Sequence, residues 1–459
     1  MDKRSICLIN DSFPPVIDGV ANAVVNYGRE IQAHYGNAAV VTPYYPDADD
    51  GVFPFPVVRY PSIDSTKLVG YRTGFPLSAE LMAQIEARHF DLIHTHCPVT
   101  STILARMLRE RLNIPLVFTY HTKFDIDIAN AIHGKLLQET SIRLLVDNIS
   151  ACDEVWTVSR GAGENLRSLG YEGDYLVMPN GVDFPAGRLP EDRVAAVTAE
   201  LNLPKNIPLF LFVGRMMWYK GIRIILDALK ALKDGGTGFR MVFIGKGTDE
   251  EEIHRYAESL GLMDWVFFHA PIYDREIIRA WYCRADLFLF PSTFDTNGLV
   301  VREAAACNLA SVLIEGSCAA EDVTDGQNGF FIQENAQSMA ELLRVLAPDW
   351  ERMRRVGENA QKEIYLSWED SVAGACRRYE IVLENFRLGR YPAHKTMAEG
   401  LLRGTAEYLD AINTIRALPG QLRQAIDEAA RENRLRAEDN RQKRQEQWEN
   451  FRQRLDRYL

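Results

Sequence analysis

The sequence predicts an α/β protein with two doubly wound, Rossmann-like parallel-sheet domains and a helical extension at the carboxyl end. Three observations predict this fold class. Short apolar strands alternate with helices over residues 1–190, and the same alternation returns over residues 207–367. A polar segment that carries two prolines, near residues 190–206, separates the two series. The chain, at 459 residues, is also too long for a single hydrophobic core.

The composition is that of a soluble globular protein with a formal net charge of −11. This acidic balance argues against nucleic acid as a partner. No uncharged apolar run reaches the roughly 20 residues of a membrane-spanning helix, and the first strand begins too close to Met1 for a secretory signal. The seven cysteines form no paired Cys-x-x-Cys arrangement, which is typical of reduced thiols. We therefore expect a cytoplasmic protein.

In the first domain, candidate ligand-binding residues follow the predicted strands. These strands are residues 5–9, 38–42, 92–95, 116–120, 154–158 and 175–178. Gly19 stands at the entrance of a predicted helix, where backbone N–H groups can bind a phosphate or a sugar. His96 and His121 follow two of the strands, and side chains there face the ligand edge of a parallel sheet. We predict a site role for His121, while a structural role and a site role both stay open for His96.

A pair of aspartates, Asp125 and Asp127, follows His121 and allows two interpretations. Asp-x-Asp is the clamp for a metal ion and a diphosphate in another class of sugar-transfer enzymes, but a tripeptide often arises by chance. The surrounding residues look like a loop that runs into a helix, and acidic residues favour a helix start. We therefore favour the helix start and predict no metal site.

In the second domain, two cations follow the first predicted strand. Arg215 and Lys220 lie between the strand 209–213 and the helix 222–232. The guanidinium offers a planar fork to a diphosphate, and the ammonium offers a point charge. Both can also be surface cations beside a turn, but a position at the end of a parallel strand favours a site. The further predicted strands are residues 239–245, 266–268, 286–290 and 311–314.

The segment Pro291–Cys307 holds the most informative pattern of the chain. Asn297 and Gly298 form a turn after a buried strand, and the residues that follow can form a helix. The start of such a helix presents unpaired N–H groups and a positive dipole end, which suits a diphosphate. Asp295 and Glu303 flank the turn as two carboxylates that can accept hydrogen bonds from sugar hydroxyls. An ordinary strand-turn-helix unit with solvated acids is the alternative.

Taken together, these segments resemble the retaining glycosyltransferases of family 4, which have the GT-B fold. The resemblance covers residues 3–386, and its motifs are specific only in combination. They are Asp18-Gly19, Tyr120-His121-Thr122, Val158-Ser159, Pro179-Asn180-Gly181-Val182-Asp183, Val213-Gly214-Arg215 with Lys220-Gly221, and the segment from Asp295 to Glu303. The resemblance implies two lobes that face a cleft, and a helix at 368–386 that crosses back onto the first domain.

The resemblance also implies a role for each matching residue. The nucleotide-sugar would lie mostly on the second domain, with its diphosphate on Arg215 and Lys220 and its ribose on Glu303. The donor sugar would contact Asp295, Asn297, Gly298, Leu299 and Val300 from the second domain, and Gly19 and His121 from the first. The chain departs from the family at one position, because Asp295 stands where a glutamate is usual and its side chain is one methylene shorter.

The implied activity is the transfer of a hexose, with glucose expected, from a UDP-sugar to an acceptor hydroxyl with retained configuration. The catalytic residues would be His121, Arg215, Lys220 and Asp295, with no metal, no cofactor and, unlike retaining hydrolases, no covalent intermediate. The segment 295–303 also looks like that of bacterial enzymes that glucosylate diacylglycerol, which suggests a lipid acceptor. The alternatives are a soluble sugar or polysaccharide acceptor, or a non-catalytic partner subunit that binds a nucleotide-sugar.

Residues 387–459 lie outside the family pattern and carry fifteen Lys/Arg against eleven Asp/Glu. Their apolar residues recur at helical spacing on both sides of Pro419-Gly420. Such an extension can pack on the body of the protein or join two subunits of a homo-oligomer. Its basic and aromatic residues can instead lie on an anionic membrane, as a lipid acceptor at the inner face of the membrane would require. An amphipathic stripe more often packs against protein, so we favour the first interpretation.

Overall fold

The computed structural model describes residues 3–16, 18–64, 72–74, 79–124, 128, 135–201, 203 and 206–392. The chain divides into two compact units. The main unit comprises Met1–Lys123 and Asn148–His394 and carries both large sheets, and the second unit comprises Phe124–Asp147 and Lys395–Leu459. The predictions for residues 393–459, including the oligomer and membrane contacts, lie outside the described residues, as do Asp125 and Asp127.

The first sheet has seven parallel strands in the order β3-β2-β1-β6-β7-β8-β9. The strands are β1 (Arg4–Ile9), β2 (Gly36–Pro43), β3 (Val57–Tyr60), β6 (Leu92–Thr95), β7 (Leu116–Tyr120), β8 (Glu154–Thr157) and β9 (Leu176–Val177). A separate antiparallel pair joins β4 (Ser62–Ile63) to β5 (Thr73–Gly74). The strand order reverses between β1 and β6, and ligands bind beside such a reversal at the carboxyl edge of doubly wound sheets.

Helices connect these strands, and several begin at side chains that cap them. The helices are α1 (Gly19–Glu30), the π-helix η1 (Ile31–Tyr35), the 3₁₀-helix η2 (Asp50–Val52), α3 (Ala79–Glu86), α4 (Thr100–Leu112), α6 (Lys135–Ser150), α7 (Arg160–Ser168), α8 (Glu191–Thr198) and the 3₁₀-helix η3 (Ala199–Leu201). The carboxylate of Asp18 accepts from the backbone N–H groups of Val20 and Ala21 at the start of α1. The hydroxyl of Ser159 accepts from the backbone N–H of Ala162 at the start of α7.

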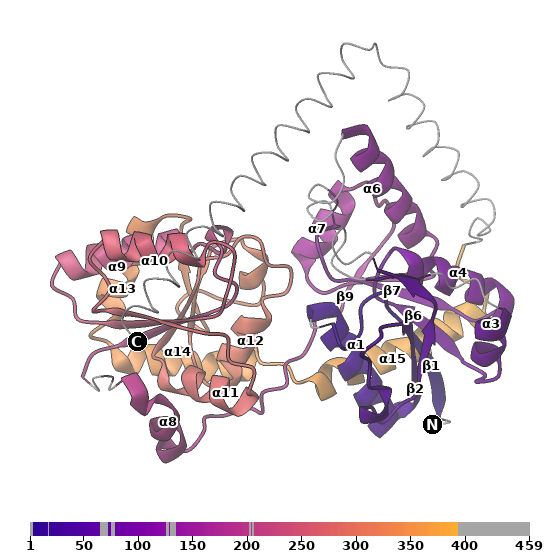
Figure 1. The fold of residues 1–459 in the computed structure, drawn as a ribbon, viewed down its shortest axis with the longest axis horizontal. Coiled ribbons are helices and arrows are strands. Elements are labelled where there is room, and N and C mark those ends of the chain that lie inside the picture. The colour runs from indigo at the N-terminus through magenta and orange to yellow at the C-terminus, as the bar shows by residue number, and fades with distance from the viewer. Residues whose placement is uncertain are drawn as a thin grey trace, which may run out of the picture. The chain divides into compact units, whose positions relative to one another are not determined.

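The second sheet has six parallel strands in the order β12-β11-β10-β13-β14-β15, and its order reverses between β10 and β13. The strands are β10 (Leu209–Val213), β11 (Arg240–Ile244), β12 (Val266–His269), β13 (Leu287–Phe290), β14 (Ser311–Ile314) and β15 (Phe330–Ile332). The helices are the 3₁₀-helix η4 (Trp218–Lys220), α9 (Ile222–Asp234), α10 (Glu250–Ser259), α11 (Arg275–Arg284), α12 (Leu299–Ala306), the 3₁₀-helix η5 (Cys318–Ala320), α13 (Ala336–Leu346), α14 (Trp350–Glu363) and α15 (Trp368–Arg387). Helices α9, α10 and α13 cover one face of this sheet, and α11 and α12 cover the other (Figure 1).

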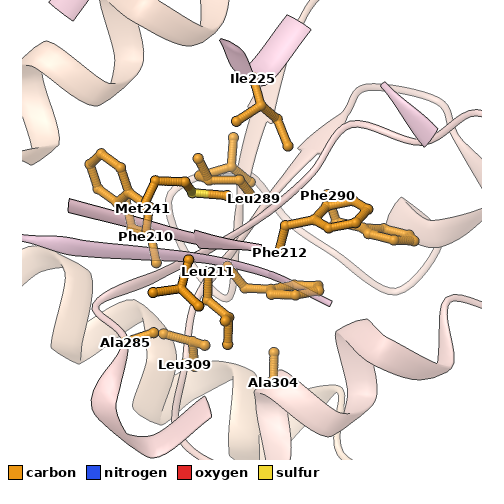
Figure 2. Packing of buried hydrophobic residues seen from close by; sticks show 14 of the residues in the cluster. Phe210, Leu211, Phe212, Ile225, Met241, Ala285, Leu289, Phe290, Ala304 and Leu309 are labelled. Carbon is orange, nitrogen blue, oxygen red and sulfur yellow. The ribbon is translucent and has the colours of Figure 1, made fainter. Parts of the chain in front are cut away.

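The strands of the second sheet are buried on both faces, which explains their continuous apolar sequences. All five residues of β10 are apolar, and Phe210, Leu211 and Phe212 are fully buried. Figure 2 shows Ile225 of α9 on one side of these strands and Ala304 of α12 on the other. This two-sided core fixes the strand ends from which the candidate site residues project.

The last described helix, α15, packs on the core of the first sheet although it follows the second sheet in sequence. Its residues Trp368, Val372 and Tyr379 are buried in one cluster with Leu8 of β1 and Tyr27 of α1. The hydroxyl of Ser371 also donates to the backbone carbonyl of Pro179. The chain therefore returns to its first domain after completing the second sheet.

The predicted fold class is confirmed, with two parallel doubly wound sheets. Two strands of these large sheets, β3 and β15, were absent from the sequence prediction, and so was the short antiparallel pair of β4 and β5. Strand β3 has four residues and strand β15 has three, and both lie at sheet edges, where short strands give little periodic signal. None of the seven cysteines, all of which are described, forms a disulfide. None of the described helices is long and apolar enough to cross a membrane.

Candidate functional site

Lys220 lies at the end of η4 and forms a buried ion pair with Asp295. Its ammonium donates to the two carboxylate oxygens of Asp295 at 2.7 and 2.8 Å, and the Lys220 residue is only 6% exposed. The hydroxyl of Ser292 donates to the same carboxylate at 2.6 Å. The segment after β10 and the segment after β13 therefore meet at a shared charge pair, as expected for adjacent strands of one sheet.

Arg215 adds a second positive charge beside this pair. The Tyr219 ring lies close to both cations, with its centroid 5.8 Å from the Arg215 guanidinium carbon and 5.5 Å from the Lys220 nitrogen. Burial lowers the pKa of Lys220, the neighbouring carboxylate of Asp295 opposes that shift, and the charge of Arg215 adds to it. Arg215 is exposed, so its guanidinium remains accessible to an anion.

Helix α12 begins next to this charge pair. Gly298 caps the helix with φ +57°, a left-handed conformation that glycine adopts at little cost. The side-chain nitrogen of Asn297 is buried and has no hydrogen-bond partner among the described residues. Both residues line a cavity of about 140 Å³. A helix start, an unpaired amide and a cavity together can accept an anionic or hydroxyl-bearing ligand.

Glu303 lies within α12, and its two oxygens each accept a hydrogen bond from the protein. Arg275 donates to one oxygen at 2.7 Å and the buried hydroxyl of Tyr282 donates to the other at 2.9 Å. Burial raises the pKa of Glu303, while Arg275 opposes that shift. Each carboxylate oxygen keeps a second lone pair, so Glu303 can still accept from a ribose hydroxyl, a role that stays a prediction.

His121 follows β7 and connects the first sheet with the segment after β13. Its backbone carbonyl accepts from the hydroxyl of Thr296 at 2.8 Å. Its imidazole is buried, with Nε2 2.9 Å from Nδ1 of His96 and Nδ1 3.5 Å from the side-chain nitrogen of Asn180. This places His121 next to the residues that precede α12 in the second domain.

Gly19 is the first residue of α1, and a side chain there would meet no protein atom within 4 Å. Local packing therefore does not require a glycine at this position.

The structure brings most of the predicted site residues together. Lys220, Asp295 and Arg215 lie near the start of α12, and His121 approaches the same segment through Thr296. Gly19 has no comparable contact that ties it to this group, so its role stays a prediction.

A second link joins the two domains of the main unit at the start of α7. The carboxylate of Glu321, after β14, accepts from the backbone N–H groups of Arg160 and Gly161 at 2.7 and 2.5 Å. A carboxylate at a helix start is favoured by the helix dipole. Glu321 and Arg160 line the same cavity as Asn297 and Gly298, so residues of both domains enclose it.

Two family models cover most of the chain. The model described as Glycosyltransferase Family 4 matches residues 17–184, and the model described as Glycosyl transferases group 1 matches residues 195–363. The chain belongs to glycosyltransferase family 4. The resemblance seen in the sequence is thereby confirmed, and the protein is a glycosyltransferase with the GT-B fold.

The glycosyltransferase has curated relatives at modest identity. It is 27% identical over 373 residues to the D-inositol 3-phosphate glycosyltransferase of Xylanimonas cellulosilytica, which covers 77% of this chain and 88% of that protein. It is 23% identical over 353 residues to the alpha-monoglucosyldiacylglycerol synthase of Acholeplasma laidlawii, which covers 74% of this chain and 87% of that protein. The two relatives carry different acceptors in their names.

Solved structures share the fold of the glycosyltransferase. The sucrose-phosphate synthase of Thermosynechococcus elongatus matches with a TM-score of 0.68 and 22% identity, over 83% of this chain and 100% of that one. The HepE protein of Anabaena, solved in complex with UDP-glucose, matches with a TM-score of 0.62 and 20% identity, over 83% of this chain and 99% of that one. At these identities the likeness concerns the fold.

Sequence reasoning missed several residues that contact the predicted ones. Arg275 and Tyr282 of α11 hold Glu303, Ser292 holds Asp295, and Thr296 holds His121. Arg275 carried a usable signal, because it opens a helix directly after β12 at the carboxyl edge of the sheet. Tyr282 carried none, since its place in the middle of an amphipathic helix is typical of a core residue.

The described part of the glycosyltransferase holds no group of three or more His, Cys, Asp or Glu side chains placed to bind a metal ion. The chemistry of the site residues that are described is that of anion binding, through Arg215, Lys220 and the start of α12.

The buried His121 predicts a pH-dependent stability for the glycosyltransferase. Burial lowers the pKa of His121 from 6.5 to about 3. Between these values the unfolded chain binds a proton that the folded chain does not, so stability is complete above pH 6.5 and is lost as the pH falls. The loss amounts to about 1.4 kcal/mol per pH unit for each such histidine. Urea unfolding at pH 7, 6 and 5 measures it.

The variant His121→Asn provides the control for this prediction. Between pH 6 and 5, the free energy of unfolding of this variant should fall less steeply than that of the unmodified protein, by about 1.4 kcal/mol per pH unit. The reason is that one buried imidazole is absent. Equal slopes for the two proteins would show that His121 does not stay neutral in the folded state.

Proposed function

We propose that this glycosyltransferase transfers a hexose, with glucose the first candidate, from a UDP-sugar to an acceptor hydroxyl with retained configuration. The observation that carries the proposal is the group formed by Lys220, Asp295 and Arg215 beside the start of α12. Two cations and a helix start in one place suit a diphosphate that departs with two negative charges. The printed title of the HepE structure names UDP-glucose as the ligand of that relative in fold.

The chemical step follows from the charges that develop in it. Breaking the bond between the sugar and the diphosphate builds positive charge on the sugar and negative charge on the leaving oxygens. Lys220 has three N–H donors and gives two contacts to Asp295, so one donor remains for a phosphate oxygen. Arg215 and the backbone N–H groups at the start of α12 bind the remaining oxygens, and we propose that the step needs no metal and no cofactor.

Retention without a covalent intermediate is the second part of the proposal. A carboxylate nucleophile must be free to attack the anomeric carbon. Asp295 is held by Lys220 and Ser292, and Glu303 is held by Arg275 and Tyr282. In the proposed step the leaving phosphate takes the proton of the acceptor hydroxyl. His121 and the backbone of Asn297–Val300 position the sugar for that exchange.

Two classes of acceptor are supported by the relatives. The synthase of Acholeplasma laidlawii acts, by its name, on a diacylglycerol lipid, and the Xylanimonas cellulosilytica relative acts on D-inositol 3-phosphate. We propose the lipid as the first candidate, which would bring the enzyme to the inner face of the membrane. A soluble sugar or polyol is the second candidate. A non-catalytic subunit that binds a nucleotide-sugar is the least supported alternative, because the charged group on which the proposed reaction depends, Lys220, Asp295 and Arg215, is present.

An acceptor screen tests the proposal. The full chain is incubated with UDP-glucose, UDP-galactose, UDP-N-acetylglucosamine or ADP-glucose, against diacylglycerol vesicles, D-inositol 3-phosphate and oligosaccharides, with and without EDTA. We expect glycosylated product from UDP-glucose, an α-linkage by NMR, and equal rates with EDTA. A β-linked product or a requirement for a divalent metal would contradict the mechanism. Release of UDP without any product in all combinations would contradict the transferase reaction.

A further inference from the structure

Three histidines lie together at the ends of β6 and β7, and one of them has an unused nitrogen. Both ring nitrogens of His94 are bonded, to the hydroxyls of Tyr379 and Thr119, each at 2.7 Å. His96 uses only Nδ1, which lies 2.9 Å from Nε2 of His121. Its Nε2 is buried and has no partner among the described residues. His94 and His96 thus differ in their surroundings although their rings lie only 4.0 Å apart.

The protonation of this group follows from its burial. Burial lowers the pKa of all three histidines, so each is neutral near pH 7. A neutral imidazole has one donor nitrogen and one acceptor nitrogen. In the described arrangement the amide nitrogen of Asn180 lies 3.5 Å from Nδ1 of His121, and because an amide nitrogen can only donate, this arrangement requires Nδ1 to be the acceptor. The proton of His121 is then on Nε2 and is donated to Nδ1 of His96.

We propose that His96 is a positioning residue that keeps Nδ1 of His121 unprotonated and turned toward the bound sugar. This inference rests on the proposed function, in which His121 contacts the donor sugar. In the described structure the contact from Asn180 is long, at 3.5 Å, so a sugar hydroxyl can replace it as the donor to Nδ1. Pro179, next to Asn180, lines the cavity that Asn297 and Gly298 also line.

The backbone of His121 lies beside the segment that, in the proposed function, binds the sugar. The backbone of His121 is bonded to Thr296, two residues before the start of α12 at Gly298. The rings of His96 and His121 are tilted by 32° with centroids 5.2 Å apart, so the two imidazoles meet nearly edge to edge through their nitrogens. An aromatic ring without nitrogen would fill the same space as His96. Control of the His121 tautomer, in contrast, requires a hydrogen-bond acceptor at the position of Nδ1.

Substitutions at His96 separate the hydrogen bond from the packing. His96→Asn keeps an acceptor oxygen near the position of Nδ1, and His96→Phe keeps an aromatic ring without an acceptor. We expect His96→Phe to lower kcat by about 10- to 100-fold with little change in KM, and His96→Asn to stay within about threefold of the unmodified protein. His94→Phe is the matched control, because it removes an equally buried histidine that does not touch His121.

A second readout needs no substrate. Nitrogen-15 NMR of the histidine side chains in the full chain reports which ring nitrogen carries the proton. We expect His121 to be protonated on Nε2 in the unmodified protein, in His96→Asn and in His94→Phe, and to gain the Nδ1-protonated form in His96→Phe. Denaturation of each variant shows whether it is folded.

The outcomes decide the proposal in either direction. A proton on Nδ1 of His121 in the unmodified protein would overturn it, and so would an unchanged tautomer in folded His96→Phe. Equal losses of kcat in folded His96→Asn and His96→Phe would also overturn it, because the acceptor at Nδ1 would then be irrelevant. The NMR measurement uses no substrate, so it tests the His121 tautomer even if the acceptor screen yields no product. A failure of the proposed function can therefore be told apart from a failure of this proposal.

Discussion

Replacing Lys220 by alanine is expected to lower kcat by about 10²- to 10³-fold while the chain stays folded. The ammonium is buried against Asp295 at the edge of the second sheet, where a charge acts more strongly than it does in water. In the proposed reaction it binds the leaving diphosphate, whose negative charge is greatest in the transition state. The loss should therefore fall on kcat rather than on KM alone.

Lys230→Ala is the matched control for this substitution. Lys230 lies on α9 in the same domain, is partly exposed, and pairs with Asp234 four residues later. Surface pairs of this kind contribute little to stability and nothing to a distant site, so kcat should be unchanged. In Lys220→Ala the carboxylate of Asp295 keeps the hydrogen bond from Ser292, so the segment before α12 remains anchored.

Steady-state kinetics with the donor and acceptor found in the screen measure both variants. A kcat of Lys220→Ala within threefold of the unmodified enzyme, with the protein folded, would refute the role of Lys220 in charge stabilisation. An increase of KM with unchanged kcat would assign Lys220 to donor binding without a role in the chemical step.

The fold was predictable from the sequence because parallel sheets are buried on both faces. Each central strand is then a short continuous apolar run, such as residues 209–213, and such runs stand out between polar loops. Strand β3 and strand β15 lie at sheet edges and have only four and three residues. These two strands form because a neighbouring strand pairs with them, and the periodicity of their own short sequences does not predict that pairing.

The sequence predicted which residues belong to the candidate site, but it did not predict which of them contact one another. Strand ends mark the ligand edge of a doubly wound sheet, which is why Lys220, Asp295 and His121 could be named. The bond between Lys220 and Asp295 joins residues 75 positions apart, and that between His96 and His121 joins residues 25 positions apart. Such pairings follow from strand order and side-chain rotamers, and local sequence contains neither.

The same limit explains the partners of Glu303. The sequence predicted a helix at this carboxylate, and the family resemblance implied a contact with ribose, but Arg275 and Tyr282 come from another helix, α11. Which face of α11 meets α12 is set by the packing of both helices on the sheet. A buried tyrosine hydroxyl needs a partner, but the sequence does not say which acceptor supplies it.

Gly221→Ala should destabilise the second domain by about 3 kcal/mol or more and should displace Lys220 from Asp295. Gly221 has φ +76°, a conformation that costs a residue with a side chain about 1–2 kcal/mol. A methyl group there would also lie 2.0 Å from the backbone carbonyl oxygen of Pro291, which is far inside contact distance. Pro291 opens the segment that carries Asp295, so relief of this clash moves the two halves of the charge pair apart.

Gly236→Ala isolates the contact from the backbone strain. Gly236 lies just beyond the other end of α9 with φ +75°, and a methyl group there would meet no atom within 4 Å. Both substitutions cost the same backbone strain. The difference between their losses of unfolding free energy, about 2 kcal/mol, therefore measures the close approach of Gly221 to Pro291. Chemical denaturation and kcat measured on both variants provide the comparison. Equal stabilities would mean that the loops after β10 and β13 are not in contact, and the charge pair on which the proposed reaction depends would lose its structural basis.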